Sequence, residues 1–139
     1  MSVIFGHDKI ISEWVSNHIF GCSDAWDDKA KAACVIKNGR VIAGVVYTNY
    51  HPERSIEMSI ATVDKSWATR HTLRAFFEYP FIDLKVKRVQ TLCSAKARDT
   101  IMFNKRLGFK PEGFHRCAWH DGGDAVSFGM LYNECKWVK

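Results

Sequence analysis

The sequence predicts a single domain of the α/β (α+β) class, with a mixed central β-sheet flanked by helices. The main observation is the stretch 55–109, whose residues read in order as strand, helix, strand and helix. A second observation is Asn38-Gly39 between two apolar runs, a pattern typical of a β-hairpin. The third is the length of 139 residues, which suits one domain around one core. Strand, helix and strand in succession imply a right-handed crossover between parallel strands.

The first part of the chain predicts a short initial strand, a helix and a hairpin. Asp8 can cap a helix that runs to about Ile19, because apolar residues recur along one face of this segment. Residues 20–28 read as a loop. The apolar runs 31–36 and 41–50 then form the two strands of the hairpin.

The central unit supplies two strands and two helices. Residues 55–63 alternate like a strand, with Ile56, Met58 and Ile60 on one face and Glu57, Ser59 and Ala61 on the other. Residues 67–79 carry apolar side chains at helical spacing, and 88–93 is rich in strand-forming residues. A shorter helix over 98–107 ends at Gly108, which suits a left-handed C-cap.

The last part of the chain predicts a second hairpin. Its strands are 113–119 and 125–132, joined across 121–124. The full predicted order is β, α, β, β, β, α, β, α, β, β.

Composition excludes several classes of protein. The hydrophobic fraction of 47% is ample for a packed core, so disorder is not expected. No apolar run reaches the roughly 18–20 residues of a membrane span, and the first residues lack the features of a secretory signal. The five cysteines form no C-x-x-C pair, which fits reduced thiols. We therefore expect a cytoplasmic protein.

Two local clusters in the sequence are candidate binding sites. His115, Cys117 and His120 do not have a common zinc spacing, so we interpret them as ordinary strand and turn residues and expect no metal. The net charge of +5 and the basic run 85–88 permit an acidic partner. A solvated connection explains the run best, and a phosphate-bearing cofactor or a nucleic acid stays open.

Three segments resemble the GNAT superfamily of N-acetyltransferases. They are Leu73–Phe81, Val86–Val89 and Arg106–Arg116, and the last is similar to the family string l-G-F-x-x-E-G-x-x-R, the most specific of the three. The resemblance covers nearly the whole chain. It is nearest to the branch of ribosomal-protein N-terminal acetyltransferases and their phage-encoded relatives. The resemblance implies a cytoplasmic protein, located in the host cytoplasm if it is encoded by a phage. It implies the GNAT fold, whose mixed sheet has a splay between its central strands.

The resemblance also implies where acetyl-CoA binds. In the family, the pantetheine arm of the cofactor lies in the splay and pairs with free backbone groups of the fourth strand, which correspond here to Ile60, Ala61 and Thr62. The pyrophosphate lies on backbone N–H groups at the start of the following helix, where the helix dipole favours negative charge. The corresponding residues here are Trp67, Ala68, Thr69, Arg70 and His71.

The phosphate-binding segment departs from the family pattern Q/R-x-x-G-x-G/A. Asp64 takes its first position, Trp67 that of the first glycine and Thr69 that of the last, so no glycine is present. Side chains at these positions crowd the close approach that glycine permits. Arg70 and His71 can contribute charge-assisted hydrogen bonds instead. We expect altered phosphate binding, with its loss as the alternative.

The catalytic residues carry over only in part. Many family members use a Glu on the fourth strand as general base, and Glu57 is the one carboxylate on that strand. The alternative is that Glu57 is simply a strand residue facing solvent. Thr100 takes the place of a Ser thought to protonate the leaving thiolate, and a hydroxyl there can donate a hydrogen bond to sulfur. Asn104 takes the place of the usual general-acid Tyr and is kept as a cofactor contact, while Ala97 replaces a family Asn.

Three functions remain open on the sequence. The first is an acetyl-CoA-dependent N-acetyltransferase that acts on a primary amine of a protein N-terminus, a lysine or a small molecule. The second is a GNAT-fold protein without catalysis that binds or inhibits another protein. The third is a nucleic-acid-binding protein, against which the absence of a basic–aromatic motif counts. Tyr132 and Trp137 near the C-terminus could supply a homodimer patch.

Overall fold

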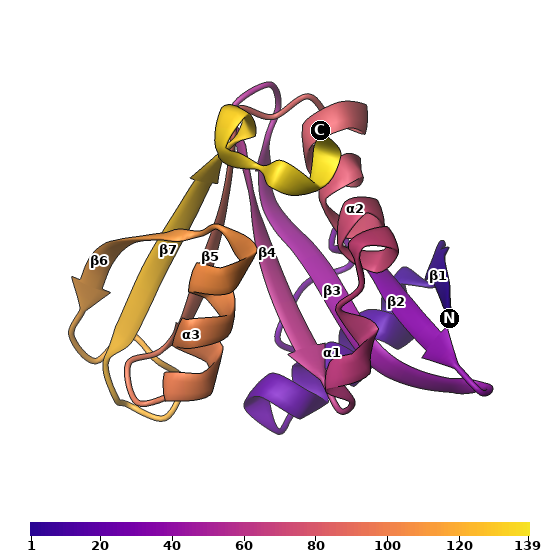
Figure 1. The fold of residues 1–139 in the computed structure, drawn as a ribbon. Coiled ribbons are helices and arrows are strands. Elements are labelled where there is room, and N and C mark those ends of the chain that lie inside the picture. Colours follow the sequence, from indigo (N-terminus) through magenta and orange to yellow (C-terminus); the bar gives the residue numbers. More distant parts are fainter.

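The computed structural model describes all residues from 1 to 139 and contains one seven-stranded mixed sheet with helices on both faces (Figure 1). The strand order is β1-β2-β3-β4-β5-β7-β6. The strands are β1 (Ser2–Phe5), β2 (Lys31–Lys37), β3 (Arg40–His51), β4 (Ser55–Thr62), β5 (Arg88–Ser94), β6 (Lys110–His115) and β7 (Ala125–Leu131). The helices are α1 (Asp8–Phe20), α2 (Arg70–Glu78) and α3 (Arg98–Leu107).

The predicted fold class and order of elements are confirmed. β4 and β5 pair in parallel, as the crossover through α2 requires, and the other neighbouring strands are antiparallel. Asn38 and Gly39 both have positive φ, 53° and 76°, which is the conformation of a tight hairpin turn. Gly108 has φ 109° at the end of α3, in agreement with the predicted left-handed cap.

Two hydrophobic cores cover the two faces of the sheet. α1 packs Ile11 and Val15 onto one face, against small residues of β2, β3 and β4. α2 lies on the other face, where its Phe76 and Phe77 belong to the larger core. α3 contributes Leu107 to that larger core. β5, β7 and β6 therefore carry a helix on one face, and α1 leaves much of their other face open (Figure 1).

Two predicted boundaries and one predicted helix cap were wrong. The helix expected from residue 67 begins at Arg70, because Thr69 takes an extended conformation and caps it together with Thr72. The strand expected over 113–119 is β6, which begins earlier, at Lys110. Pro111 is acceptable there because β6 is an edge strand. Asp8 does not cap α1; its carboxylate accepts a hydrogen bond from the N–H of Ala32 at 2.9 Å.

The end of α2 depends on a hydrogen bond from the sheet. Pro80 has no N–H, so the carbonyl of Phe76 lacks its normal partner four residues on. The Tyr47 hydroxyl on β3 donates to this carbonyl at 2.6 Å, and the contact is buried. The chain continues in a wide π turn, Tyr79–Asp83, with Leu84 N–H bonded to the Tyr79 carbonyl at 3.0 Å. Tyr47 thus ties α2 to the centre of the sheet.

The C-terminal segment packs against α2 and bonds to the end of α3. The Trp137 indole N–H donates to the Leu107 carbonyl at 2.9 Å and Trp137 is half-buried, whereas the expected dimer patch requires it to be exposed. Tyr132 is exposed as expected. No helix of the chain has the length and apolar character needed to cross a bilayer.

Candidate functional site

The sheet opens between its two central strands. β4 and β5 pair at three positions only, the last of which places Glu57 opposite Gln90. Beyond this pair, β4 stays with β3 as far as Thr62, and β5 stays with β7 as far as Ser94. The two strands diverge as a V, which Figure 1 shows between β4 and β5. Glu57 therefore lies at the vertex of the splay.

The register identifies which backbone groups face the gap. Val63 N–H donates to the Ile42 carbonyl, so Ala61, two residues earlier, directs its backbone groups toward β3 as well. Ile60 and Thr62 alternate with these residues and direct theirs toward β5, which has already diverged. Of the three residues predicted to pair with a pantetheine arm, Ile60 and Thr62 present free backbone groups, while Ala61 is committed to β3.

The predicted phosphate-binding segment is folded upon itself. Lys65–Trp67 forms a 3-10 turn, and the Trp67 side chain is only 1% exposed, packed against Phe76 and Phe103. Several of its N–H groups have internal acceptors: those of Trp67, Ala68, Thr69 and Thr72. Arg70 and His71 are the first two residues of α2, and both are exposed. A phosphate at this end would meet these two residues and the dipole of α2.

The two predicted residues of α3 differ in exposure. Thr100 lies in the first turn, exposed, and the Ala97 side chain provides no cap there. Asn104 lies one turn later and is 6% exposed, a buried polar side chain beside the larger core. Both residues stay predictions as site residues.

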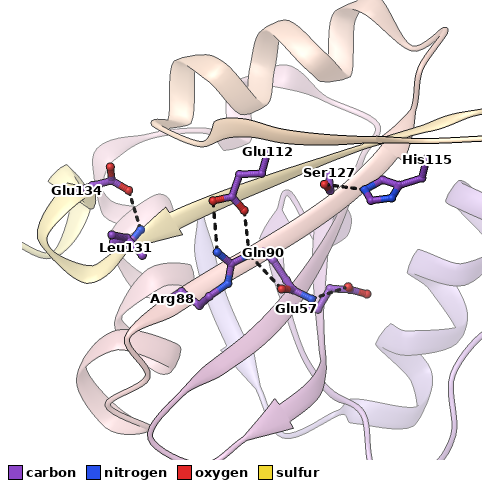
Figure 2. Close-up of polar contacts among 8 residues, drawn as sticks. All are labelled: Glu57, Arg88, Gln90, Glu112, His115, Ser127, Leu131 and Glu134. Carbon is purple, nitrogen blue, oxygen red and sulfur yellow. Dashed lines mark hydrogen bonds and ion pairs between the residues drawn. The ribbon is translucent and has the colours of Figure 1, made fainter.

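The open face of the sheet carries a network of polar side chains around Glu57 (Figure 2). The Gln90 amide nitrogen lies 3.4 Å from Glu57 Oε1, and the Gln90 amide oxygen accepts from Arg88 Nη2 at 3.1 Å. Arg88 also pairs with both carboxylate oxygens of Glu112, at 3.0 and 3.3 Å. Beside them, His115 Nε2 lies 2.8 Å from Ser127 Oγ. A hollow of about 280 Å³ opens over this network and is lined by Glu57, Arg88, Gln90, Thr91, Leu92, His115 and Ser127.

Two glycines provide the space that this network occupies. A Cβ placed on Gly129 would lie 2.2 Å from Glu112 Oε1, so the Glu112 carboxylate crosses β7 directly above this glycine. A Cβ on Gly113 would lie 2.9 Å from His115 Nε2 and 3.0 Å from Ser127 Oγ. Glycine at both positions lets the side chains of β6 fold back toward β5 and the splay.

A buried hydroxyl lies next to Glu57 without a partner. Thr48 on β3 is directly opposite Glu57 on β4, so the two side chains share one face of the sheet. Thr48 Oγ1 is buried and makes no hydrogen bond within the protein. Since buried polar atoms are rarely left unpaired, this hydroxyl is available to a bound molecule or a water beside the carboxylate.

Aromatic contacts join α1 to the loop between β6 and β7. The ring of Phe20, at the end of α1, lies 5.6 Å from that of Trp119 and 5.0 Å from that of His120. It also makes an edge contact with Trp26. These residues connect the β1–β4 half of the sheet to the β5–β7 half on the side that carries the polar network.

A larger hollow, about 610 Å³, is lined by Phe81, Ile82, Lys85, Val86, Lys87, Leu131, Tyr132 and Asn133. Its walls are mainly apolar and carry no carboxylate or imidazole. The chemistry of acid–base catalysis therefore points to the smaller hollow at the splay.

Sequence reasoning found Glu57 and missed its neighbours Arg88, Gln90 and Glu112. Strand alternation could have placed Arg88 and Gln90 on one face of β5. The parallel register that brings this face beside Glu57 is not visible in the sequence. His115 was interpreted as an ordinary strand residue; in the structure it contacts Ser127 at the hollow, and no three His, Cys, Asp or Glu side chains are grouped to hold a metal.

Comparisons with known proteins give a structural likeness only. No protein-family model matches the sequence, and no curated protein matches it either. A solved structure described as "Probable acetyltransferase" has a TM-score of 0.64 and 20% identity, over 76% of this chain and 63% of that one. A mutant of the spermidine N-acetyltransferase SpeG from Vibrio cholerae has a TM-score of 0.67 and 19% identity, over 81% of this chain and 70% of that one. Another SpeG mutant has a TM-score of 0.68 and 17% identity, over 81% of this chain and 69% of that one.

These TM-scores show that the architecture is shared. The chain spans 63% of the length of the first of these structures. The matched element order, the parallel pair β4–β5 and the splay beyond Glu57 agree with the fold expected from the sequence. The chain has the GNAT acetyltransferase fold.

Proposed function

We propose that this protein is an acetyl-CoA-dependent N-acetyltransferase that acetylates a primary amine by direct attack in a ternary complex. The observation that carries the proposal is the position of Glu57. It lies at the last pair before β4 and β5 diverge, and its carboxylate lines the hollow on the open face. A carboxylate at the vertex of the splay can take a proton from an amine that enters from this face.

The residues around the splay fit the cofactor. Backbone groups of Ile60 and Thr62 would pair with the pantetheine arm, as in a sheet whose neighbouring strand is absent. Arg70 and His71 at the start of α2 would hold the pyrophosphate. Acetyl-CoA supplies the activated thioester, and no metal is needed for this chemistry.

The chain's own side chains then account for the proton transfers. Glu57 takes a proton from the acceptor ammonium, directly or through a water held at Thr48, and frees the lone pair of the nitrogen. Thr100 donates a hydrogen bond to the departing sulfur, and the thiolate takes up the second proton that the nitrogen loses as the amide forms. Overall, an alkylammonium and acetyl-CoA give an N-acetyl amide, coenzyme A as the thiol and one proton.

A binding protein without catalysis is the second candidate. The observation in its favour is the segment before α2, where the buried Trp67 takes the place of a glycine and several N–H groups have internal acceptors. Such a protein would keep the splay and the polar network but would not bind acetyl-CoA.

One pair of measurements separates the two candidates. Calorimetric titration with acetyl-CoA tests binding, and a screen of peptides, lysine derivatives and polyamines tests transfer. Glu57→Gln keeps the shape of the side chain but removes its proton acceptor, so turnover should fall about 10²–10⁴-fold with acetyl-CoA affinity nearly intact. The acidic limb of the pH–rate profile should also disappear. A Gln variant within a few-fold of wild type would rule out Glu57 as the base.

The acceptor and the assembly are part of the same proposal. The motif resemblance favours the ribosomal-protein branch and its phage-encoded relatives, hence a protein N-terminus. The SpeG structures belong to an enzyme named for spermidine. A homodimer through the exposed Tyr132 would cover part of the larger hollow; light scattering that gives a single 15.9 kDa species would exclude it.

A further inference from the structure

We propose that Gln90 is a positioning residue for the Glu57 carboxylate, and that Arg88 and Glu112 fix the orientation of its amide. This inference rests on the proposed function, in which Glu57 is the general base. It names a chain of contacts that runs from β6 across β7 and β5 to the vertex of the splay (Figure 2).

Arg88 determines which way the amide points. A guanidinium can only donate hydrogen bonds, so the group of Gln90 that lies 3.1 Å from Arg88 Nη2 has to be the amide oxygen. The NH₂ group then faces Glu57 Oε1, at 3.4 Å. This distance is long for a hydrogen bond, as catalytic contacts often are before substrate binds. The orientation of the amide therefore follows from the hydrogen-bonding chemistry of its two neighbours, Arg88 and Glu57.

Glu112 in turn holds Arg88. Two contacts, at 3.0 and 3.3 Å, join the guanidinium to both oxygens of the carboxylate, in a forked geometry that restricts its rotation. The pair is one-third to two-fifths exposed, with relative exposures of 33% for Arg88 and 42% for Glu112. Its contribution to stability is therefore small. The Glu112 carboxylate reaches Arg88 only because Gly129 has no side chain beneath it.

The consequence for Glu57 is a fixed carboxylate with one oxygen engaged. Gln90 donates to Oε1, which leaves Oε2 for the proton of the acceptor. A reversed amide would place its oxygen against the carboxylate and repel the ionised form. The other charged or titratable groups that line this hollow are Arg88 and His115, with Glu112 behind Arg88.

The test uses a property of the sequence. Gln90 is the only glutamine, so selective side-chain labelling of the full chain gives a single amide NH₂ pair in a nitrogen–proton NMR spectrum. In the wild type these signals should move with pH as Glu57 changes charge, and Glu57→Met, which adds no second glutamine, should abolish that movement. Arg88→Met should reduce the movement at least about twofold, because the amide is then free to reverse. Gly129→Ala, whose Cβ would displace the Glu112 carboxylate, should have a weaker effect of the same kind.

The matched control is Arg74→Met, which breaks an exposed pair with Glu78 on α2, remote from the network. It should leave the Gln90 signals unchanged. Once an acceptor is known, Gln90→Met and Arg88→Met should each lower kcat about 5- to 50-fold and move the acidic limb of the profile to higher pH. The KM for acetyl-CoA should stay within about twofold, because neither residue is among those proposed to hold the cofactor.

The failure of this inference can be told apart from that of the proposed function. Gln90 signals that change neither with pH nor in Glu57→Met would refute the contact, and signals unchanged by Arg88→Met would refute the role of Arg88. Either result overturns the inference even if Glu57→Gln abolishes turnover. Conversely, full activity of Glu57→Gln would overturn the base, and the NMR result would still report the orientation of Gln90.

Discussion

Removal of the Tyr47 hydroxyl should destabilise the protein through α2 rather than through the sheet. Tyr47→Phe leaves the ring in its buried place but takes away the donor to the Phe76 carbonyl. Pro80 cannot replace this donor, because it has no N–H. The carbonyl would then be buried without a partner.

The size of the effect follows from that unpaired group. A buried acceptor left without a hydrogen bond costs about 1–3 kcal/mol. For a domain of this size, each kcal/mol lowers Tm by about 3–4 °C, so the variant should melt about 3–12 °C below wild type. Tyr50→Phe, on the same strand but exposed, should change Tm by less than about 2 °C.

A double-mutant cycle identifies the cause. Pro80→Ala returns an N–H to the position from which a helix normally reaches the Phe76 carbonyl. In that background Tyr47→Phe should cost about half as much as in wild type, or less, in thermal or denaturant unfolding. An equal cost in both backgrounds would show that the hydroxyl does not substitute for the missing donor, and the reasoning would fail.

Three further expectations concern single groups. Burial raises the pKa of Tyr47 well above its ordinary value of 10. The free energy of unfolding should therefore be constant below about pH 10 and fall above it, because only the unfolded chain lets this Tyr ionise. Tyr47→Phe should reduce this fall, as measured by denaturant unfolding at a series of pH values. Thr48→Val removes an unpaired buried hydroxyl, so Tm should be unchanged or higher. The KM of the acceptor should rise about 3- to 10-fold, and an unchanged KM would exclude Thr48 from the acceptor site. Arg70→Glu should weaken acetyl-CoA binding about tenfold or more in calorimetry, while Arg74→Glu, one turn further along α2, should have a smaller effect. Equal affinity of Arg70→Glu and wild type for acetyl-CoA would contradict the phosphate site.

The sequence predicted those features that depend on local chemistry. Asn38-Gly39 and Gly108 were found because positive φ restricts the residue type at these positions. The splay was expected only through the family resemblance, and Glu57 was singled out for the same reason. The start of α2 was misplaced because the apolar Trp67, which precedes the apolar stripe, was counted with the helix, whereas it reaches the core from a 3-10 turn. Apolar character alone does not distinguish these two routes to burial.

The rest of the site depends on register, which has no local signal. Gln90 meets Glu57 because β4 and β5 pair in parallel with that particular offset. Glu112 reaches Arg88 because only β7 lies between β6 and β5 and because the residue of β7 beneath the Glu112 carboxylate is Gly129. These relations join residues far apart in the chain, so a reading of one sequence could not supply them.

The splay gives the central strand β4 an unpaired edge. β4 is the middle strand of seven, yet beyond Glu57 one side of it is an edge, with backbone amides that no neighbouring strand protects. Isolated edges on a protein surface invite pairing with other chains, and proteins usually guard them with charge or proline. Here the edge is enclosed between two half-sheets that share only three residue pairs. In hydrogen exchange, the amides of Ile60 and Thr62 should therefore exchange faster than that of Ala61, so that one strand contains both slow and fast protons in alternation.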